Sequence, residues 1–205
     1  MADAWIKFCG CTGWSDVESA IEAGADAFGM IFAPSPRRIS LDAAARIAKR
    51  VPSSIEPVAV FVNPSESLVQ EVDELFRSLR LQFSGDETPA FVGRFGERAI
   101  KAIHVDAEAT LVAERAARFP SALLLLDARQ DGMAGGTGHT FAWEHAVPLA
   151  AGRRVVVAGG LTPENVAECV TRVRPFGVDV RTGIETGDRK DPEKMRAFVR
   201  AVRGA

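Results

Sequence analysis

Short apolar segments typical of buried strands alternate with amphipathic helix patterns along the whole chain. The clearest unit begins at residues 155–157, three valines that are followed closely by Gly159 and Gly160. An uninterrupted β-branched run favours a parallel strand that is buried on both faces. Eight such strand–helix units, spaced at roughly twenty to thirty residues, predict an α/β fold, a single (β/α)8 TIM barrel.

The alternative to a closed barrel is an open, doubly wound sheet. Such a sheet rarely needs eight parallel strands, and no G-x-G-x-x-G motif follows the first apolar segment. The pattern is weakest at the fourth unit, where residues 87–95 have little periodicity. The expected strands cover residues 5–9, 27–32, 58–62, 79–83, 99–105, 122–126, 155–157 and 176–183.

Capping residues mark the expected helix starts. Ser, Thr and Asp side chains can accept the free amides of a first helical turn, and Pro suits the first helical position. A Ser followed three residues later by Glu forms a capping box. These signals predict helix starts at Ser15 with Glu18, at Ser40, at Thr162 with Pro163, and at Asp191 with Pro192.

Size and charge limit the classes of function. The 205 residues, 47% of them hydrophobic, suffice for one core, so residues 1–205 are expected to form one domain. A net charge of -2 with mixed signs provides no basic field for nucleic acid or a membrane surface. Neither a membrane-spanning run nor a signal peptide is recognisable, which favours a cytoplasmic protein. Three cysteines argue against a disulfide framework.

Two groups suited to proton transfer end expected strands. Cys9 ends the first strand and Asp127 the sixth, and in a barrel both would lie at the carboxyl-terminal rim, where active sites form. There they could act as base and acid on one substrate. Alternatively, Cys9 is a small buried hydrophobe and Asp127 caps a turn. Cys11 raises the possibility of a metal site, but further Cys or His ligands at usual spacing are missing.

Charged residues near these groups have two readings each. Alternation along the first strand places Lys7 on the face of Cys9, where it would favour a thiolate, or where it would pair with an acid such as Asp179. Both can hold. Arg37 and Arg38 lie in the loop after the second strand, where one of the two guanidinium groups could bind a carboxylate bidentately. Neighbouring prolines restrict that loop, whereas paired surface arginines are usually only solvated.

The last two strands end in small residues. Gly159 and Gly160 follow the seventh strand, and Thr182 and Gly183 follow the eighth, where barrels frequently bind phosphate through backbone amides. An ordinary tight turn is the alternative for the glycine pair. Residues 128–142 are rich in glycine and are expected to be either a mobile cover or an exposed connection. No metal site or catalytic triad is expected from His104, His139 and His145.

Seven segments resemble one known family, and they occur in the family's order along the chain. They are KFCGCT (7–12), SPRRIS (35–40), IKAIHV (100–105), LLLDAR (124–129), GGTGHTFAW (135–143), AGGLTPENV (158–166) and GVDVRTGIETG with the following KD (177–191). By these segments the chain resembles the phosphoribosylanthranilate isomerases. The resemblance implies a TIM barrel enzyme, an aldose–ketose isomerase of tryptophan biosynthesis that needs no metal or cofactor.

The resemblance also implies a reaction and its residues. The reaction is the Amadori rearrangement of N-(5-phosphoribosyl)anthranilate to 1-(2-carboxyphenylamino)-1-deoxyribulose 5-phosphate. Cys9 would be the general base, Asp127 the general acid, and Arg37 the ligand of the anthranilate carboxylate. The phosphate would bind at the backbone of the two strand ends described above, namely Gly159, Gly160, Thr182 and Gly183. Apart from the resemblance, Lys7, Asp179 and Arg181 are candidates for tuning the charge of the site.

Three positions depart from the family pattern. Ser84 replaces a histidine, Ala142 an acidic residue, and Arg181 a serine; Arg181 could contact phosphate or face outward. The expected partner is the small-molecule phosphosugar–anthranilate substrate, and the chain is expected to be a monomer or homodimer. The alternatives are another phosphosugar isomerase or epimerase, and a sugar-phosphate-binding barrel without catalysis. An epimerase would want metal-binding His and Asp at several strand ends, and these are missing.

Overall fold

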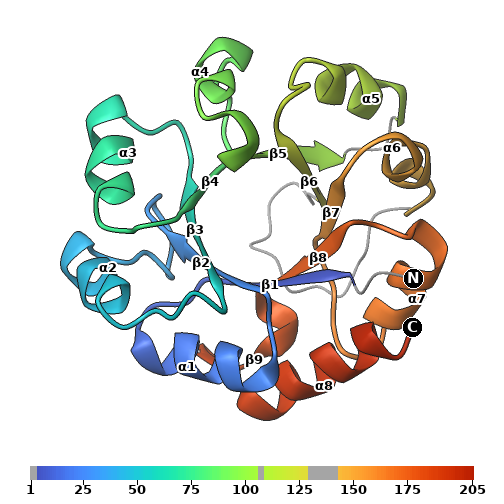
Figure 1. The fold of residues 1–205 in the computed structure, drawn as a ribbon. Coiled ribbons are helices and arrows are strands. Elements are labelled where there is room, and N and C mark those ends of the chain that lie inside the picture. Colours follow the sequence, from blue (N-terminus) through green and yellow to red (C-terminus); the bar gives the residue numbers. More distant parts are fainter. Residues whose placement is uncertain (1–3, 106–108, 129–142) are drawn as a thin grey trace.

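The computed structural model describes residues 4–105, 109–128 and 143–205. Within them, eight strands pair in sequence order and close into a barrel, and the helices form an outer ring (Figure 1). All pairs of neighbouring barrel strands are parallel, including β8 with β1. The predicted (β/α)8 barrel is confirmed, and the open sheet is excluded because β8 pairs with β1.

The barrel strands lie close to the predicted ranges. Their bounds are β1 (Trp5–Cys9), β2 (Ala27–Ile31), β3 (Glu56–Phe61), β4 (Arg80–Phe83), β5 (Ala99–Val105), β6 (Leu123–Ala128), β7 (Val155–Ala158) and β8 (Gly177–Val180). The eighth strand is shorter than predicted, because Thr182–Ile184 form the 3-10 helix η3. A short antiparallel pair follows, β9 (Glu185–Thr186) with β10 (Arg189–Lys190).

The helices connect successive strands on the outside of the barrel (Figure 1). Ser40 and Asp191 cap α2 and α8 as predicted, because their side-chain oxygens accept amides of the first turn. The helices are α1 (Trp14–Ala23), α2 (Leu41–Ala48), α3 (Glu66–Asp73), α4 (Pro89–Gly93), α5 (Ala109–Ala117), α6 (Val147–Gly152), α7 (Val166–Val173) and α8 (Pro192–Arg203), with short 3-10 helices η1 (Gly96–Arg98) and η2 (Trp143–His145).

Two predicted helix starts are wrong. Ser15 lies inside α1, whose first flanking residue is Gly13, so the capping box with Glu18 does not form. Thr162 precedes a turn, and α7 starts only after Asn165. The Thr162 hydroxyl accepts the Glu164 amide at 3.3 Å, and the Thr162 amide donates to the Asn165 side chain at 2.8 Å, so both contacts brace the turn that precedes α7.

The core has an inner and an outer layer because successive strand residues face opposite sides. On β1, Phe8 faces outward and packs edge-on against Phe198 of α8, with ring centroids 6.0 Å apart. Burying such a side chain contributes about 1.5–3 kcal/mol. Cys9 faces inward and packs within the barrel. The inner layer holds Cys9, Ala27, Ile31, Ala33, Val58, Val60, Ile100, Ala102, Leu123, Leu125, Val156 and Ala158.

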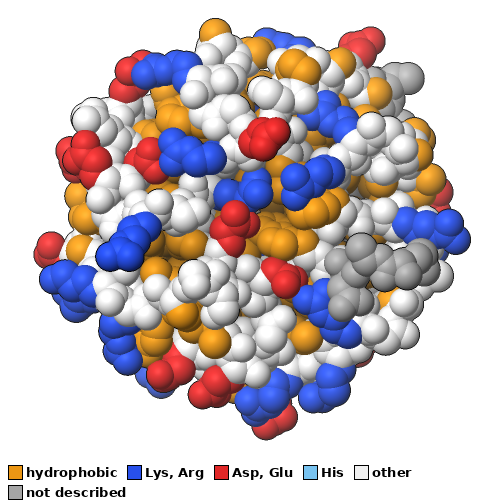
Figure 2. Space-filling model, viewed as in Figure 1, with side chains coloured by type: hydrophobic (Ala, Val, Ile, Leu, Met, Phe, Trp, Pro, Cys, Tyr) orange, Lys and Arg blue, Asp and Glu red, His pale blue; other side chains and the backbone are white. Residues whose placement is uncertain are grey.

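The surface carries charges of both signs. Figure 2 shows Lys and Arg side chains interspersed with Asp and Glu over the visible face. In the described ranges, no helix has the length and hydropathy needed to cross a bilayer. The glycine-rich residues 129–142, with His139 and Ala142, lie outside the described residues.

Candidate active site

Lys7 and Cys9 meet inside the barrel at the point where β1 lies beside β2. The neighbouring residue of β2 is Gly29, and a Cβ there would be 3.0 Å from the Cys9 sulfur and 3.1 Å from Lys7 Nζ. The missing side chain therefore leaves the space in which thiol and ammonium approach each other. Lys7 Nζ also donates to Asp179 Oδ1 at 2.9 Å, because β1 pairs with β8 in that register. The structure thus places Lys7 beside the Cys9 thiol and in an ion pair with Asp179.

The charges around Cys9 act in opposite directions. Burial raises the pKa of the Cys9 thiol, and nearby Asp179 raises it further, whereas Lys7 and Lys190 lower it; the net effect is a pKa above the ordinary value. Burial alone would lower the pKa of Lys7, but Asp179 and Cys9 hold it above its ordinary range. Lys7 therefore stays charged beside a sulfur that is mainly a thiol.

Asp127 lies near the end of β6, beside His104 of β5 and Ala158 of β7. Leu123 and Leu125 of the same strand belong to the inner layer, so alternation directs Asp127 to the same side. Burial, and after it the charge of Asp179, raise the pKa of the Asp127 carboxyl to about 6. A carboxyl group with this pKa can carry a proton near neutral pH and act as an acid.

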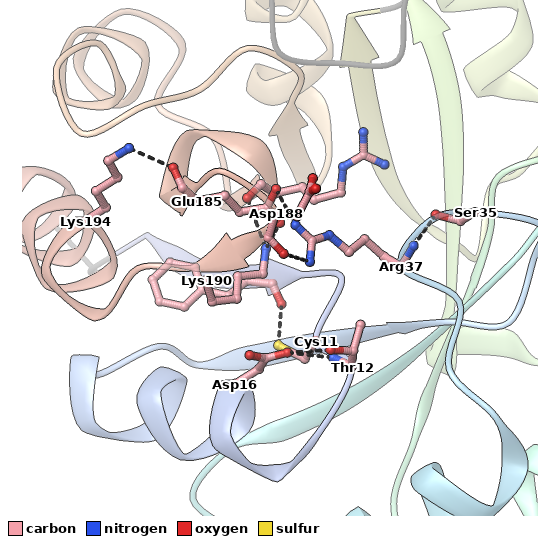
Figure 3. A network of polar contacts seen from close by, with 11 residues as sticks. Cys11, Thr12, Asp16, Ser35, Arg37, Glu185, Asp188, Lys190 and Lys194 are labelled. Atoms are coloured by element: carbon pink, nitrogen blue, oxygen red, sulfur yellow. Dashed lines mark hydrogen bonds and ion pairs between the residues drawn. The ribbon is translucent and has the colours of Figure 1, made fainter.

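Arg37 is fixed by residues that follow β8. Its Nη2 atom lies 3.0 Å from Glu185 Oε2, and its Nη1 atom donates to the Asp188 carbonyl (Figure 3). The Ser35 hydroxyl accepts the Arg37 amide at 3.1 Å and holds the loop after β2. Arginine has five N–H donors, so these contacts still leave donors for a carboxylate ligand.

Arg181 extends along the rim beside Arg37. A Cβ on Gly10 would lie 3.4 Å from Arg181 Cγ and 3.6 Å from Arg37 Cγ, so both side chains cross the loop after β1. Within the part of the chain that the structure describes, the Arg181 guanidinium makes no hydrogen bond or ion pair. Its charge lowers the pKa of Asp127, against the larger effects of burial and Asp179. Arg181 therefore faces the site.

The loops after β7 and β8 touch each other. Gly159 and Gly160 have φ angles of 86° and 65°, a backbone conformation that other residues rarely adopt. The Asn165 side chain donates to the Gly160 carbonyl at 2.9 Å and braces this turn. A Cβ on Gly183 would be only 1.9 Å from the Leu161 carbonyl oxygen, so only glycine permits this contact. The two predicted phosphate-binding segments are therefore neighbours.

The structure reveals two site residues that no motif argument selected. Glu185 and Lys190 face each other in the β9–β10 pair, with Lys190 Nζ 2.9 Å from Glu185 Oε1. Both lie within residues 177–191, the last segment that resembles the family, which is the signal in the sequence that points to them. Among the described residues, no group of His, Cys, Asp and Glu is arranged to hold a metal.

The model of the N-(5'phosphoribosyl)anthranilate (PRA) isomerase family matches residues 6–201. The chain belongs to the phosphoribosylanthranilate isomerase family. Its resemblance to that family is thereby confirmed, and the chain is an enzyme of tryptophan biosynthesis, an intramolecular aldose–ketose isomerase.

Named relatives of this isomerase match over nearly its full length. N-(5'-phosphoribosyl)anthranilate isomerase of Desulforudis audaxviator is 42% identical over 200 residues, 98% of each chain. The isomerase of Thiobacillus denitrificans is 44% identical over 197 residues, 95% of each chain. The crystal structure of the Thermotoga maritima isomerase has a TM-score of 0.89 and 33% identity, covering 98% of this chain and 100% of that one.

One solved phosphoribosylanthranilate isomerase shows a ligand. That structure contains reduced 1-(o-carboxyphenylamino)-1-deoxyribulose 5-phosphate, and it matches this isomerase with a TM-score of 0.86 at 32% identity, covering 98% of this chain and 100% of that one. The fold thus accommodates a small phosphorylated molecule in that relative.

Ser84, which departs from the family pattern, is held by a buried neighbour. Its hydroxyl accepts a hydrogen bond from the Gln82 side chain at 3.1 Å.

Proposed function

We propose that this isomerase converts N-(5-phosphoribosyl)anthranilate into 1-(2-carboxyphenylamino)-1-deoxyribulose 5-phosphate by general acid–base catalysis. One observation carries the proposal. Cys9 and Asp127 occupy inward-facing positions at the carboxyl ends of their strands. The charges of Lys7 and Asp179 act on the pKa of both groups. A thiol and a carboxyl group under the same two charges suit two proton transfers on one substrate.

Asp127 is the proposed general acid. Its protonated carboxyl donates to the furanose ring oxygen, the C1–O bond breaks, and the nitrogen lone pair forms an iminium ion at C1. The raised pKa of about 6 leaves part of the carboxyl protonated near neutral pH. An anionic substrate nearby raises that fraction further.

Cys9 is the proposed general base. Its thiolate removes the C2 proton, the electron pair of the C–H bond forms the C1–C2 double bond, and the iminium nitrogen becomes neutral. The enolamine then tautomerises to the 2-ketone by taking a proton at C1 and losing the proton of the C2 hydroxyl group to solvent. Lys7 tunes this step, because its positive charge favours the thiolate. Asp179 holds Lys7 in place.

The remaining residues bind the two ends of the substrate. Arg37 binds the anthranilate carboxylate through donors that Glu185 and Asp188 leave available. Backbone amides bind the phosphate at the touching loops after β7 and β8, at Gly159, Gly160, Thr182 and Gly183. Arg181, whose side chain crosses the rim, tunes the charge of Asp127. Fixing both ends aligns C1 and C2 with the acid and base.

A fluorescence assay tests the proposed function. The purified chain is mixed with freshly made N-(5-phosphoribosyl)anthranilate, and loss of the anthranilate fluorescence is followed. The expected result is turnover that disappears in the Cys9→Ser, Asp127→Asn double variant. Folded protein that binds the substrate without turnover would indicate a sugar-phosphate-binding barrel, and turnover of a different phosphosugar only would indicate another isomerase or epimerase.

We further propose that residues 1–205 form one cytoplasmic domain, with a small-molecule substrate and without nucleic acid or membrane partners. The state of assembly is proposed to be monomer or homodimer. In support, one Thermotoga maritima structure is of monomers generated from a dimeric phosphoribosylanthranilate isomerase. Sedimentation at several protein concentrations tests this, and a stable higher oligomer would contradict it.

A further inference from the structure

The Glu185 carboxylate lies between two cations that come from different parts of the rim. Arg37 approaches its Oε2 atom from the loop after β2, and Lys190 approaches its Oε1 atom from β10, at 3.0 and 2.9 Å (Figure 3). The side chains of Glu185 and Lys190 are 7% and 2% exposed, and that of Arg37 is 16% exposed. Water therefore weakens these attractions little, and each oxygen of the carboxylate holds one partner.

Lys190 has a second contact that reaches the proposed phosphate-binding segment. Its Nζ atom donates to the Arg181 carbonyl at 3.0 Å. That carbonyl shares a planar trans peptide with the Thr182 N–H, so the two groups point in opposite directions. Holding the carbonyl on one side fixes the direction of the Thr182 N–H on the other. The positive charge of the Lys190 ammonium beside the carbonyl oxygen also polarises the peptide and strengthens its N–H as a donor.

We propose that Glu185 and Lys190 are positioning residues that set the Arg37 guanidinium relative to the Arg181–Thr182 peptide, and so match the site to the spacing between the carboxylate and phosphate of its substrate. This inference rests on the proposed roles of Arg37 and Thr182. Neither Glu185 nor Lys190 touches the reacting atoms. Their effect is on how well the two anionic ends are bound together.

A second buried Lys–Glu pair provides a matched control. Lys101 Nζ lies 2.9 Å from Glu87 Oε2, their side chains are 5% and 3% exposed, and Lys101 also donates to backbone carbonyls, those of Phe83 and Gly85. This pair fixes the loop after β4. It resembles the Glu185–Lys190 pair in burial and bonding, but it has no contact with Arg37 or with the loop after β8.

The test measures the binding of two related inhibitors to Glu185→Gln. One is reduced 1-(o-carboxyphenylamino)-1-deoxyribulose 5-phosphate, and the other is its anilino counterpart without the carboxylate. The amide keeps a bond to Lys190 but loses the charge that holds Arg37. We expect affinity for the first compound to fall about tenfold, and affinity for the second to change by less than about twofold. Glu87→Gln should reduce thermal stability without changing the ratio of the two affinities.

A double-mutant cycle shows whether Glu185 acts through Arg37. If it does, adding Glu185→Gln to Arg37→Ala changes the affinity for the carboxylated compound by less than about twofold, because the guanidinium to be positioned is gone. An equal loss in both backgrounds would overturn the inference. So would tighter binding by Glu185→Gln, since it would show that Glu185 competes with the substrate for Arg37. An unchanged affinity in Arg37→Ala would instead refute the proposed role of Arg37, and the inference with it.

Inhibition by inorganic phosphate tests the proposed role of Lys190. As a competitive inhibitor it occupies only the phosphate-binding segment, so Lys190→Met should weaken its inhibition about tenfold, while Glu185→Gln should change it less than about threefold. The Lys101→Met variant controls for the loss of a buried ammonium. Unchanged phosphate inhibition in folded Lys190→Met, or an equal loss in Lys101→Met, would overturn the assignment of Lys190.

Discussion

Cys9 is buried and Asp127 is half-buried at the barrel rim, and the pKa of each is raised, yet their surroundings differ. Two ammonium groups, those of Lys7 and Lys190, oppose the effect of burial on Cys9. For Asp127, the carboxylate of Asp179 adds to the effect of burial, and Arg181 and Lys7 oppose it. Asp179 raises the pKa of both groups, and two cations lower the pKa of each, but the largest charge effect differs: it comes from the cation Lys7 at Cys9 and from the like charge of Asp179 at Asp127.

The two pKa values show that the free enzyme is rarely in the protonation state that catalysis needs. With the pKa of Asp127 near 6 and that of Cys9 above its ordinary 9.0, neutral solution favours a carboxylate and a thiol. The reaction needs a carboxylic acid and a thiolate. Binding an anionic substrate favours protonation of Asp127, and the iminium ion then favours deprotonation of Cys9. The substrate thus completes the protonation state.

Removing either group gives the largest expected effect. Cys9→Ser leaves a hydroxyl that is a far weaker base, and Asp127→Asn leaves an amide that has no proton to donate. We expect each to lower kcat by about 10²–10⁴-fold, with unfolding free energies within about 1 kcal/mol of the parent. Stopped-flow turnover and urea unfolding provide the measurements. A folded variant with a near-parental rate would remove that residue from its proposed role.

Removing Lys7 should lower the stability of the fold and also reduce the ionisation of Cys9. Lys7→Met leaves Asp179 as a buried carboxylate without its partner, which costs about 3–5 kcal/mol of stability. The thiol also loses its main cation, so the thiolate fraction falls. Urea unfolding measures the first effect, and the rate of iodoacetamide alkylation of Cys9 at fixed pH measures the second. The double variant Lys7→Met, Asp179→Asn should regain much of the stability; failure to do so would argue against the pair as its source.

The dependence of kcat/KM on pH follows from the two raised pKa values. Below the pKa of Asp127, about 6, the acid stays protonated while the thiolate fraction rises with pH, so the rate rises. Above it, the falling fraction of protonated Asp127 cancels the rise, and a plateau follows. The rate falls once Cys9 is fully ionised. Initial rates at low substrate concentration from pH 5 to 10 would measure this profile; a maximum without a plateau would contradict it.

Replacing Arg181 should give the smallest effect. Arg181→Ser removes a cation that lowers the pKa of Asp127, so the bend at which the rising limb meets the plateau should move to higher pH. We expect kcat/KM on the plateau to change by less than about tenfold, because burial and Asp179 dominate the Asp127 pKa. Arg38→Ser, in the loop after β2, is the matched control for loss of one rim charge. A bend that stays in place in Arg181→Ser would show that the guanidinium does not act on Asp127.

Periodicity predicted the barrel because each strand carries its own signal. Valine runs such as the one in β7, and alternation along β1, depend only on neighbours in the sequence. The placement of Lys7 beside both Cys9 and Asp179 followed from alternation and from closure of the barrel. These parts of the site are local in sequence or fixed by strand register, and so they could be predicted.

Other parts depend on contacts between distant loops. Glu185 meets Arg37 because η3 shortens β8 and the chain then turns into the β9–β10 pair, which no periodic pattern announces. The predicted cap at Ser15 failed for a local reason: Asp16 accepts the Thr12 amide at 2.8 Å, and the residue that precedes α1 is Gly13, two positions before Ser15. Local rules name the residue types that can satisfy an amide, but packing decides which one does.

The ion pair of Lys7 with Asp179 joins residues 172 positions apart. During synthesis the sulfur of β1 leaves the ribosome early, whereas the strand that completes its surroundings is made almost last. At about 5–20 residues per second, the interval is roughly ten to thirty seconds. Throughout it, the nascent chain carries a cysteine without its final neighbours, so the protein gains its chemistry only when its last βα unit docks.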